Sequence, residues 1–226
     1  MDPLLLEELE DANKGIKPSP FGEFRFVVPV APVSVQSTRA RKDAQEKLIR
    51  AELSHYTFLL VGDVSIEVTW LLDFVTRYES DSAPDVDNIL KPLLDSVVGP
   101  TGILVDDCQV NSIIASAQSW MDREEVQIHI RFIPDEFVQK DGLIFVELDR
   151  NLCFPLNERK PDDVMRICIE MLERSMAARD ELEALGASRE EARYLMPARR
   201  LFHKSRVVRH FPCESLASFK ARRGFL

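Results

Sequence analysis

Alternating apolar and polar residues predict a sheet in the first 135 residues of the chain. In residues 64–72, for example, Val64, Ile66 and Val68 alternate with polar neighbours, as expected of a strand with one buried side. Four segments carry such a strand pattern: Glu23–Val28, Val64–Leu72, Val110–Ala117 and Val126–Phe132. The sequence therefore predicts a sheet with one apolar face.

Two helices are predicted between these strands. Thr38–Leu53 is rich in Arg and Lys, and its basic face is either solvated or in contact with nucleic acid. The second helix follows a loop over residues 73–84, runs from Asp85 to about Val98, and ends at Gly99-Pro100. Its predicted buried side is Leu90, Leu93, Leu94, Val97 and Val98.

The C-terminal part has a different pattern. Leu143–Leu148 is consistent with one more strand, and residues 161–184 are predicted to form a long helix that begins at Pro161. The predicted core stripe of this helix is Val164, Ile167, Cys168, Met171, Leu172 and Ala178. Ser188 and Glu191 have capping-box spacing and predict a further helix. We expect an extension over residues 1–21, a domain over 22–135, and a mainly helical C-terminal region over 136–226.

Composition places the chain among ordinary globular proteins. Of 226 residues, 45% are hydrophobic and 30% are charged, and no apolar run approaches the roughly 20 residues of a membrane span. The acidic N-terminus does not resemble a secretory signal. Four scattered cysteines form no Cys-x-x-Cys pair, so we expect free thiols, no zinc site and a cytoplasmic location.

Charge is unevenly distributed along the chain. The net charge is −9, yet residues 192–226 contain nine Lys or Arg and one acid, Glu214. This basic segment either contacts nucleic acid or neutralises the acidic remainder of the protein. The candidate phosphate contacts are Arg199, Arg200, Lys204, Arg206, Arg209, Lys220, Arg222 and Arg223. Interleaved phenylalanines, Phe202, Phe211 and Phe219, either stack on bases or anchor the segment to the core.

Carboxylates are concentrated in two short segments. Asp85 and Asp87 flank Val86, and the pair Asp106-Asp107 follows at the start of a predicted strand. Carboxylates held close together repel one another, and a divalent cation relieves this repulsion. An oxygen-only ligand set suits Mg²⁺ or Mn²⁺ better than zinc. The alternative is structural, because Asp-x-Asp-Asn is also typical of turns and helix N-caps.

Lys91 adds a cation to the first acidic segment. It lies four residues after Asp87 and four before Asp95, so the three share one helix face. Such a polar edge on an otherwise apolar helix indicates a site.

These residues carry a family resemblance. The segment from Pro84 to Asp95 is similar to the D-x-D-N-x-x-K-x-x-x-D signature of the RusA family of Holliday-junction resolvases. The family's second motif, D-D-x-Q-V, is matched by residues 106–110, and the proline-rich segment 28–36 resembles the family's N-terminal strand and loop. The resemblance spans roughly residues 22–133. It implies an α+β fold with a mixed sheet and flanking helices.

The resemblance also implies a function. By analogy, Asp85, Asp87 and Asp107 bind catalytic Mg²⁺, for which Mn²⁺ can substitute, and Lys91 contacts the scissile phosphate. Asn88, Asp106 and Gln109 match the signature in supporting positions. The implied activity is cleavage of branched DNA by a homodimer, since symmetric incision of a four-way junction needs two sites. The alternative is a nucleic-acid-binding or interaction protein that keeps the fold without cleavage.

Overall fold

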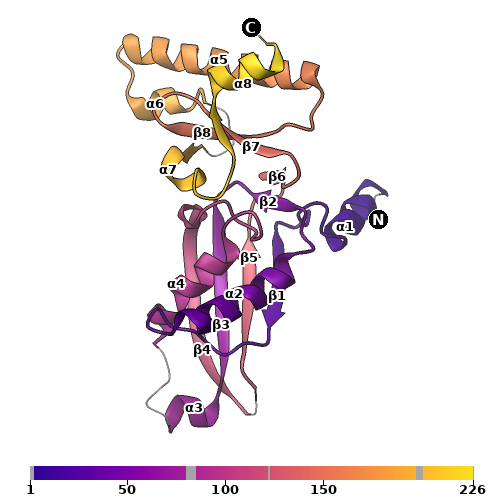
Figure 1. Cartoon of the computed structure of the whole chain (residues 1–226), viewed down its shortest axis with the longest axis vertical. Helices are drawn as coiled ribbons and strands as arrows, with labels where there is room; N and C mark the ends of the chain where they lie inside the picture. The colour runs from indigo at the N-terminus through magenta and orange to yellow at the C-terminus, as the bar shows by residue number, and fades with distance from the viewer. Residues whose placement is uncertain (1–2, 80–84, 122, 197–200, 226) are drawn as a thin grey trace. The chain divides into compact units, whose positions relative to one another are not determined.

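The chain forms two compact units, residues 1–140 and 141–226 (Figure 1). The structure is a computed structural model that describes residues 3–79, 85–121, 123–196 and 201–225. Each unit has its own sheet and helices, so the predicted α+β class is confirmed. None of the helices in these described ranges is long and apolar enough to cross a membrane.

The first unit is built on a mixed four-stranded sheet with the order β1-β5-β3-β4. β5 pairs antiparallel with both β1 and β3, whereas β4 runs parallel to β3. The strands are β1 (Glu23–Val28), β3 (Val64–Asp73), β4 (Val110–Trp120) and β5 (Glu125–Arg131). All four correspond to strands predicted from the alternation of apolar residues.

Two helices cover one face of this sheet, α2 (Arg39–Leu53) and α4 (Val86–Val97), as Figure 1 shows. The alternation in β3 explains this arrangement, because Val64, Ile66, Val68, Trp70 and Leu72 share one face of the strand and pack in the core with the helices. The core they form includes Phe26, Val28, Ile49, Leu53, Val68, Trp70, Ile89, Leu93 and Val97. Both predicted helices are thus confirmed, and their apolar stripes supply one half of the core.

Shorter elements complete the first unit. They are α1 (Pro3–Asn13), a two-stranded antiparallel sheet of β2 (Phe58–Leu60) and β6 (Phe137–Gln139), α3 (Phe74–Tyr78), and the 3-10 turn η1 (Asp107–Gln109). The expected loop over 73–84 was therefore wrong for residues 74–78, which form α3. Residues 80–84 of that loop lie outside the described residues.

The second unit also contains a mixed sheet, with the order β10-β7-β8-β9. Its strands are β7 (Leu143–Glu147), β8 (Leu152–Asn157), β9 (Phe202–His203) and β10 (Cys213–Ser215). Its helices are α5 (Asp162–Ala184), α6 (Arg189–Arg193), α7 (Lys204–Val207) and α8 (Leu216–Arg223). The predicted strand at 143, the long helix and the Ser188 capping box are confirmed. The strands β8, β9 and β10 had no clear sequence signal.

The buried side of α5 agrees with the predicted stripe at Leu172 and differs from it elsewhere. Met165, Ile169 and Leu172 pack in the core, whereas Val164, Ile167 and Met171 are exposed. Both sets have helical spacing, so periodicity alone did not identify the buried side. The inward side packs against Ile144 and Val146 of β7 and against Phe154 and Leu156 of β8.

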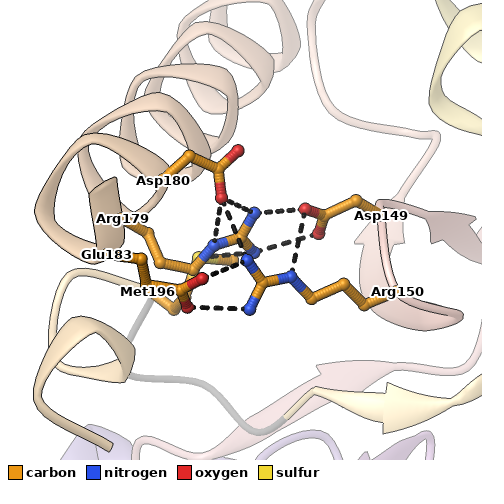
Figure 2. A network of polar contacts seen from close by, with 6 residues as sticks. All are labelled: Asp149, Arg150, Arg179, Asp180, Glu183 and Met196. Carbon is orange, nitrogen blue, oxygen red and sulfur yellow. Dashed lines mark hydrogen bonds and ion pairs between the residues drawn. The ribbon is translucent and has the colours of Figure 1, made fainter. Parts of the chain in front are cut away.

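Polar contacts join α5 to the hairpin between β7 and β8 (Figure 2). The hairpin turn places Arg150 and Asn151 in the left-handed region, with φ of 55° and 59°. Arg150 forms two hydrogen bonds of 2.8 Å with the Glu183 carboxylate. Arg179, only 3% exposed, forms a bidentate pair with Asp149 and also bonds Asp180. The network therefore fixes a strained turn against the helix.

Replacing Arg179 with Ala is expected to lower the free energy of unfolding of the second unit by about 2–3 kcal/mol. This is less than for a fully buried pair, because the carboxylate partners keep contact with water. Arg174→Ala is the matched control on the same helix, since the Arg174 side chain is 82% exposed and its pair with Glu170 is long, at 3.6 Å. It should change stability by less than about 0.5 kcal/mol. Urea denaturation followed by circular dichroism measures both variants.

At acid pH, the free energies of unfolding of wild type and Arg179→Ala should differ less than they do at neutral pH. The hydrogen bond from Arg179 lowers the pKa of Asp149, so this carboxylate stabilises the fold above its ordinary pKa. That contribution is lost as the pH falls through the lowered pKa. A stability difference that stays constant into strong acid, or an equal loss in Arg174→Ala, would contradict the assignment.

Candidate active site

A tight turn after α4 returns the chain alongside this helix. The amides of Ile103 and Leu104 both donate to the carbonyl oxygen of Val97, at 2.8 and 3.0 Å. Gly102 makes this possible, because a Cβ at that position would lie 2.2 Å from the same Val97 oxygen. Residues 103–105 are consequently buried and deliver the acidic pair 106–107 next to α4.

Gln109 fixes the acidic pair in place. Its side chain is buried, and its Oε1 accepts hydrogen bonds from the amides of Val105 and Asp106 at 2.8 and 3.1 Å. Its Nε2 donates to the carbonyl oxygens of Leu60 and Gly62 at 2.9 and 2.8 Å. The Asp106 carboxylate accepts from the Cys108 amide at 3.0 Å and so begins the turn η1. Asp107 lies between these residues in the chain, so the hydrogen bonds of Gln109 and Asp106 fix its position.

Lys91 and Asp107 meet across this turn. The Lys91 Nζ lies 2.9 Å from Asp107 Oδ2 and 2.7 Å from Asp95 Oδ1. Hydrogen bonds to Asp95, the larger cause, and to Asp107 raise the pKa of Lys91 above its ordinary value. The contact brings together residues that are sixteen positions apart in the sequence.

Asp85 and Asp87 lie at the N-terminal end of the same helix. Asp85 occupies the N-cap position, but its side chain makes no capping hydrogen bond. Asp87 is in the first turn, and both residues are exposed. The sequence also allowed a purely structural role for Asp85 as a helix cap. The side chain makes no capping hydrogen bond, so the structure does not support that role. The backbone of Asn88 ties α4 to the loop before α2, since its carbonyl oxygen accepts a hydrogen bond from the Val35 amide at 2.9 Å.

The carboxylates suit a hard cation by their chemistry. Asp85, Asp87 and Asp107 offer oxygen ligands only, and each has access to solvent. Within the described residues, no group of three or more His, Cys, Asp or Glu is arranged closely enough to hold a metal ion. Convergence of the three carboxylates on one ion therefore stays a prediction.

A groove between α2 and α4 opens beside Lys91. Its volume is about 460 Å³, and Lys91, Pro92, Asp95 and Ser96 form one wall. The other wall is Val35, Arg39, Lys42, Asp43 and Glu46. The basic face of α2 was expected either to be solvated or to contact nucleic acid, and two of its cations, Arg39 and Lys42, line the groove beside Lys91. The signal was missed because α2 and α4 are neighbours only in the fold.

The basic C-terminal segment is largely paired within its own unit. Lys204 bonds Glu147 and Lys220 bonds Glu173, both at 2.7 Å. Arg222 pairs with Glu158 and Glu214, and Arg223 pairs with Asp162. Phe202, Phe211 and Phe219 are buried, which supports anchoring to the core over base stacking. Arg199 and Arg200 lie outside the described residues.

A comparison with protein families supports the resemblance. The family model of endodeoxyribonuclease RusA matches residues 29–131. This segment includes the Lys91–Asp107 contact, β3, β4 and β5, so the predicted resemblance to the family is confirmed for residues 29–131. No curated protein matches the chain.

Replacing Gln109 with Ala is expected to destabilise the first unit by about 2–4 kcal/mol. The change removes four hydrogen bonds from buried backbone groups, and unpaired buried groups are costly. Fluorescence-detected urea denaturation reports on this unit, because Trp70 and Trp120 both belong to it. Gln36→Ala serves as the control at an exposed position. Equal effects from the two substitutions would contradict the role given to Gln109.

Proposed function

We propose that the protein is an Mg²⁺-dependent, structure-specific endodeoxyribonuclease that cleaves phosphodiester bonds in branched DNA such as Holliday junctions. The observation that carries the proposal is the contact between Lys91 and Asp107. It joins the two signature motifs of the endodeoxyribonuclease RusA family at one exposed place in the fold. The activity suggested by that family in general is endonucleolytic, and the metal, the branched substrate and a homodimer are finer parts of the proposal.

The chain's residues have distinct roles in this proposal. Asp85, Asp87 and Asp107 would hold Mg²⁺, or Mn²⁺ in its place, and the bound ion would activate water and stabilise charge on the phosphate. Lys91 would release Asp107 to the metal and turn its ammonium group to a phosphate oxygen. Lys91 is an ammonium ion at neutral pH, as lysines ordinarily are, and so carries the positive charge that this role needs.

The α2–α4 groove offers a path for the DNA backbone. Arg39 and Lys42 line it opposite Lys91, so three cations face a single channel. Asp43, Glu46 and Asp95 offset their charge, which makes the groove a weaker attractor than a purely basic surface. With mixed charges of this kind, the groove is better suited to position one phosphate group, through Lys91 and Arg39, than to bind duplex DNA tightly.

A binding protein without cleavage is the second candidate. It is favoured by the finding that Lys91 already neutralises Asp107, together with the absence of an assembled three-carboxylate group among the described residues. The two functions differ in a cleavage assay. A protein that binds four-way junctions and leaves them intact with both Mg²⁺ and Mn²⁺ would establish the second.

Asp107→Asn is expected to reduce cleavage of a four-way junction by at least about 100-fold, because a carboxylate ligand becomes a neutral amide. Lys91→Ala should reduce turnover by roughly 100-fold, since it removes charge stabilisation at the phosphate. Both variants should fold, as the two side chains are solvent-accessible. Rates measured at saturating Mg²⁺ test the prediction.

Asp135→Asn is the control, an exposed aspartate outside the signature. It should cleave at the wild-type rate. The assigned site is wrong if Asp107→Asn retains that rate as well.

Arg39→Gln is expected to weaken junction binding and flatten its dependence on salt. Each phosphate contact that is lost should lower the slope of log K against log salt by about 0.9. Lys47→Gln is a matched control, because Lys47 is exposed on the same helix and does not line the groove. Binding titrations at several salt concentrations, without metal, measure both. Identical slopes for the two variants would remove the groove from the DNA path.

The same titrations test the basic segment through an Arg206→Gln, Arg209→Gln double variant. A flatter salt slope supports DNA contact by this segment. An unchanged slope with a lower melting temperature supports pairing within the protein.

A further inference from the structure

Asp95 holds Lys91 at least as closely as Asp107 does, yet the proposed chemistry gives it no role. Its Oδ1 lies 2.7 Å from the Lys91 Nζ, whereas the Asp107 Oδ2 lies 2.9 Å from it. An ammonium group has three N–H donors, so it can serve both carboxylates at once. Asp95 belongs to α4 itself, one turn after Lys91, and Asp107 belongs to η1. Lys91 therefore stands between one carboxylate that the metal is proposed to take and one that it is not.

The stability of α4 does not account for Asp95. The residue lies in the last turn of the helix, where the macrodipole favours cations and disfavours acids. Its pair with Lys91 also has the less favourable order, since the acid of an i,i+4 pair is better placed before the base. Both side chains are more than half exposed, and exposed pairs contribute little to stability. An acid placed against these preferences indicates a role beyond the helix.

The two carboxylates differ in their access to solvent. The side chain of Asp95 is 59% exposed and that of Asp107 is 31% exposed. Asp95 and Lys91 also lie on the same wall of the α2–α4 groove, the proposed path of the DNA backbone. A Lys91 side chain that keeps only its Asp95 contact would therefore stay in the groove.

We propose that Asp95 is a positioning residue, which keeps the Lys91 ammonium group at the groove wall when a divalent cation takes the Asp107 carboxylate. The inference rests on the proposed function and extends it to a residue that acts through Lys91 rather than on the metal.

The exchange of partners explains why a second carboxylate is useful. A cation bound at Asp107 repels the ammonium group of Lys91. Asp95 then leaves that group with an ion pair, so Lys91 does not have to stay on Asp107 or lose its partners altogether. In the metal-free protein the contribution is smaller, because two carboxylates share one ammonium group and repel each other. Asp95 thus favours the metal-bound state, and it does so through Lys91.

A double-mutant cycle followed by isothermal titration of Mn²⁺ into the free protein tests this role. Asp95→Asn is expected to weaken Mn²⁺ binding roughly threefold, which is the size of one exposed ion pair. In the Lys91→Ala background the same substitution should change the affinity by less than about 1.5-fold, because the group through which Asp95 acts is gone.

Two further variants serve as controls in the same titrations. Asp95→Glu keeps a carboxylate within reach of Lys91 and should restore most of the Mn²⁺ affinity. Glu10→Gln removes an exposed acid that forms an i,i+4 pair with Lys14 at 3.5 Å, outside the groove. It should leave the affinity unchanged.

Thermal unfolding separates the positioning role from a structural one. Asp95→Asn should melt no lower than wild type, because the substitution removes an acid from the last turn of a helix. A structural role predicts a lower melting temperature together with unchanged Mn²⁺ affinity, and that result would overturn the inference.

The inference is also wrong if Asp95→Asn weakens Mn²⁺ binding equally with and without Lys91, since Asp95 would then act on the metal directly. Either failure leaves the proposed nuclease activity standing if wild type cleaves a four-way junction. Coupling between Asp95 and Lys91 in a protein that binds Mn²⁺ but does not cleave DNA would retain this inference and refute the nuclease activity. A wild type that binds no Mn²⁺ would overturn both.

Discussion

The site depends on the buried side chain of Gln109. Its four hydrogen bonds satisfy two amides and two carbonyl groups, and thereby tie the segment 105–109 to the end of β2. An amide side chain suits this role because it donates and accepts at once without introducing charge into the core. With the segment held, Asp107 has a defined place beside α4, and Lys91 is within reach of it.

Electrostatics then gives the site two states. In the structure, the Lys91 ammonium group pairs with the carboxylates of both Asp95 and Asp107. A divalent cation at Asp107 would compete with Lys91 for the same oxygen, and Lys91 would then be available to a phosphate group. The proposed chemistry follows from this exchange of partners, and the groove lined by Arg39 and Lys42 gives the phosphate a route to Lys91.

Much of the first unit could be predicted from its sequence. The strands at Glu23 and Val64 alternate clearly, and Gly99-Pro100 ends α4 where expected. The contact of Lys91 with Asp107 was not predicted from the sequence, because the turn that creates it depends on Gly102 and on buried backbone bonds. The second unit was harder. Its short strands carry few residues, and α5 has two apolar stripes, so packing decided what periodicity could not.

The proposed function requires that Asp85, Asp87 and Asp107 hold a divalent metal ion. Isothermal titration of Mn²⁺ into the free protein tests it directly, with Asp107→Asn and Asp135→Asn compared under the same conditions. One Mn²⁺ site is expected in wild type and in Asp135→Asn, and binding weakened by at least about tenfold is expected in Asp107→Asn. Lys91→Ala should keep the site, since it removes only a competing cation. Equal Mn²⁺ affinity in wild type and Asp107→Asn, or no Mn²⁺ binding by wild type, would contradict the account.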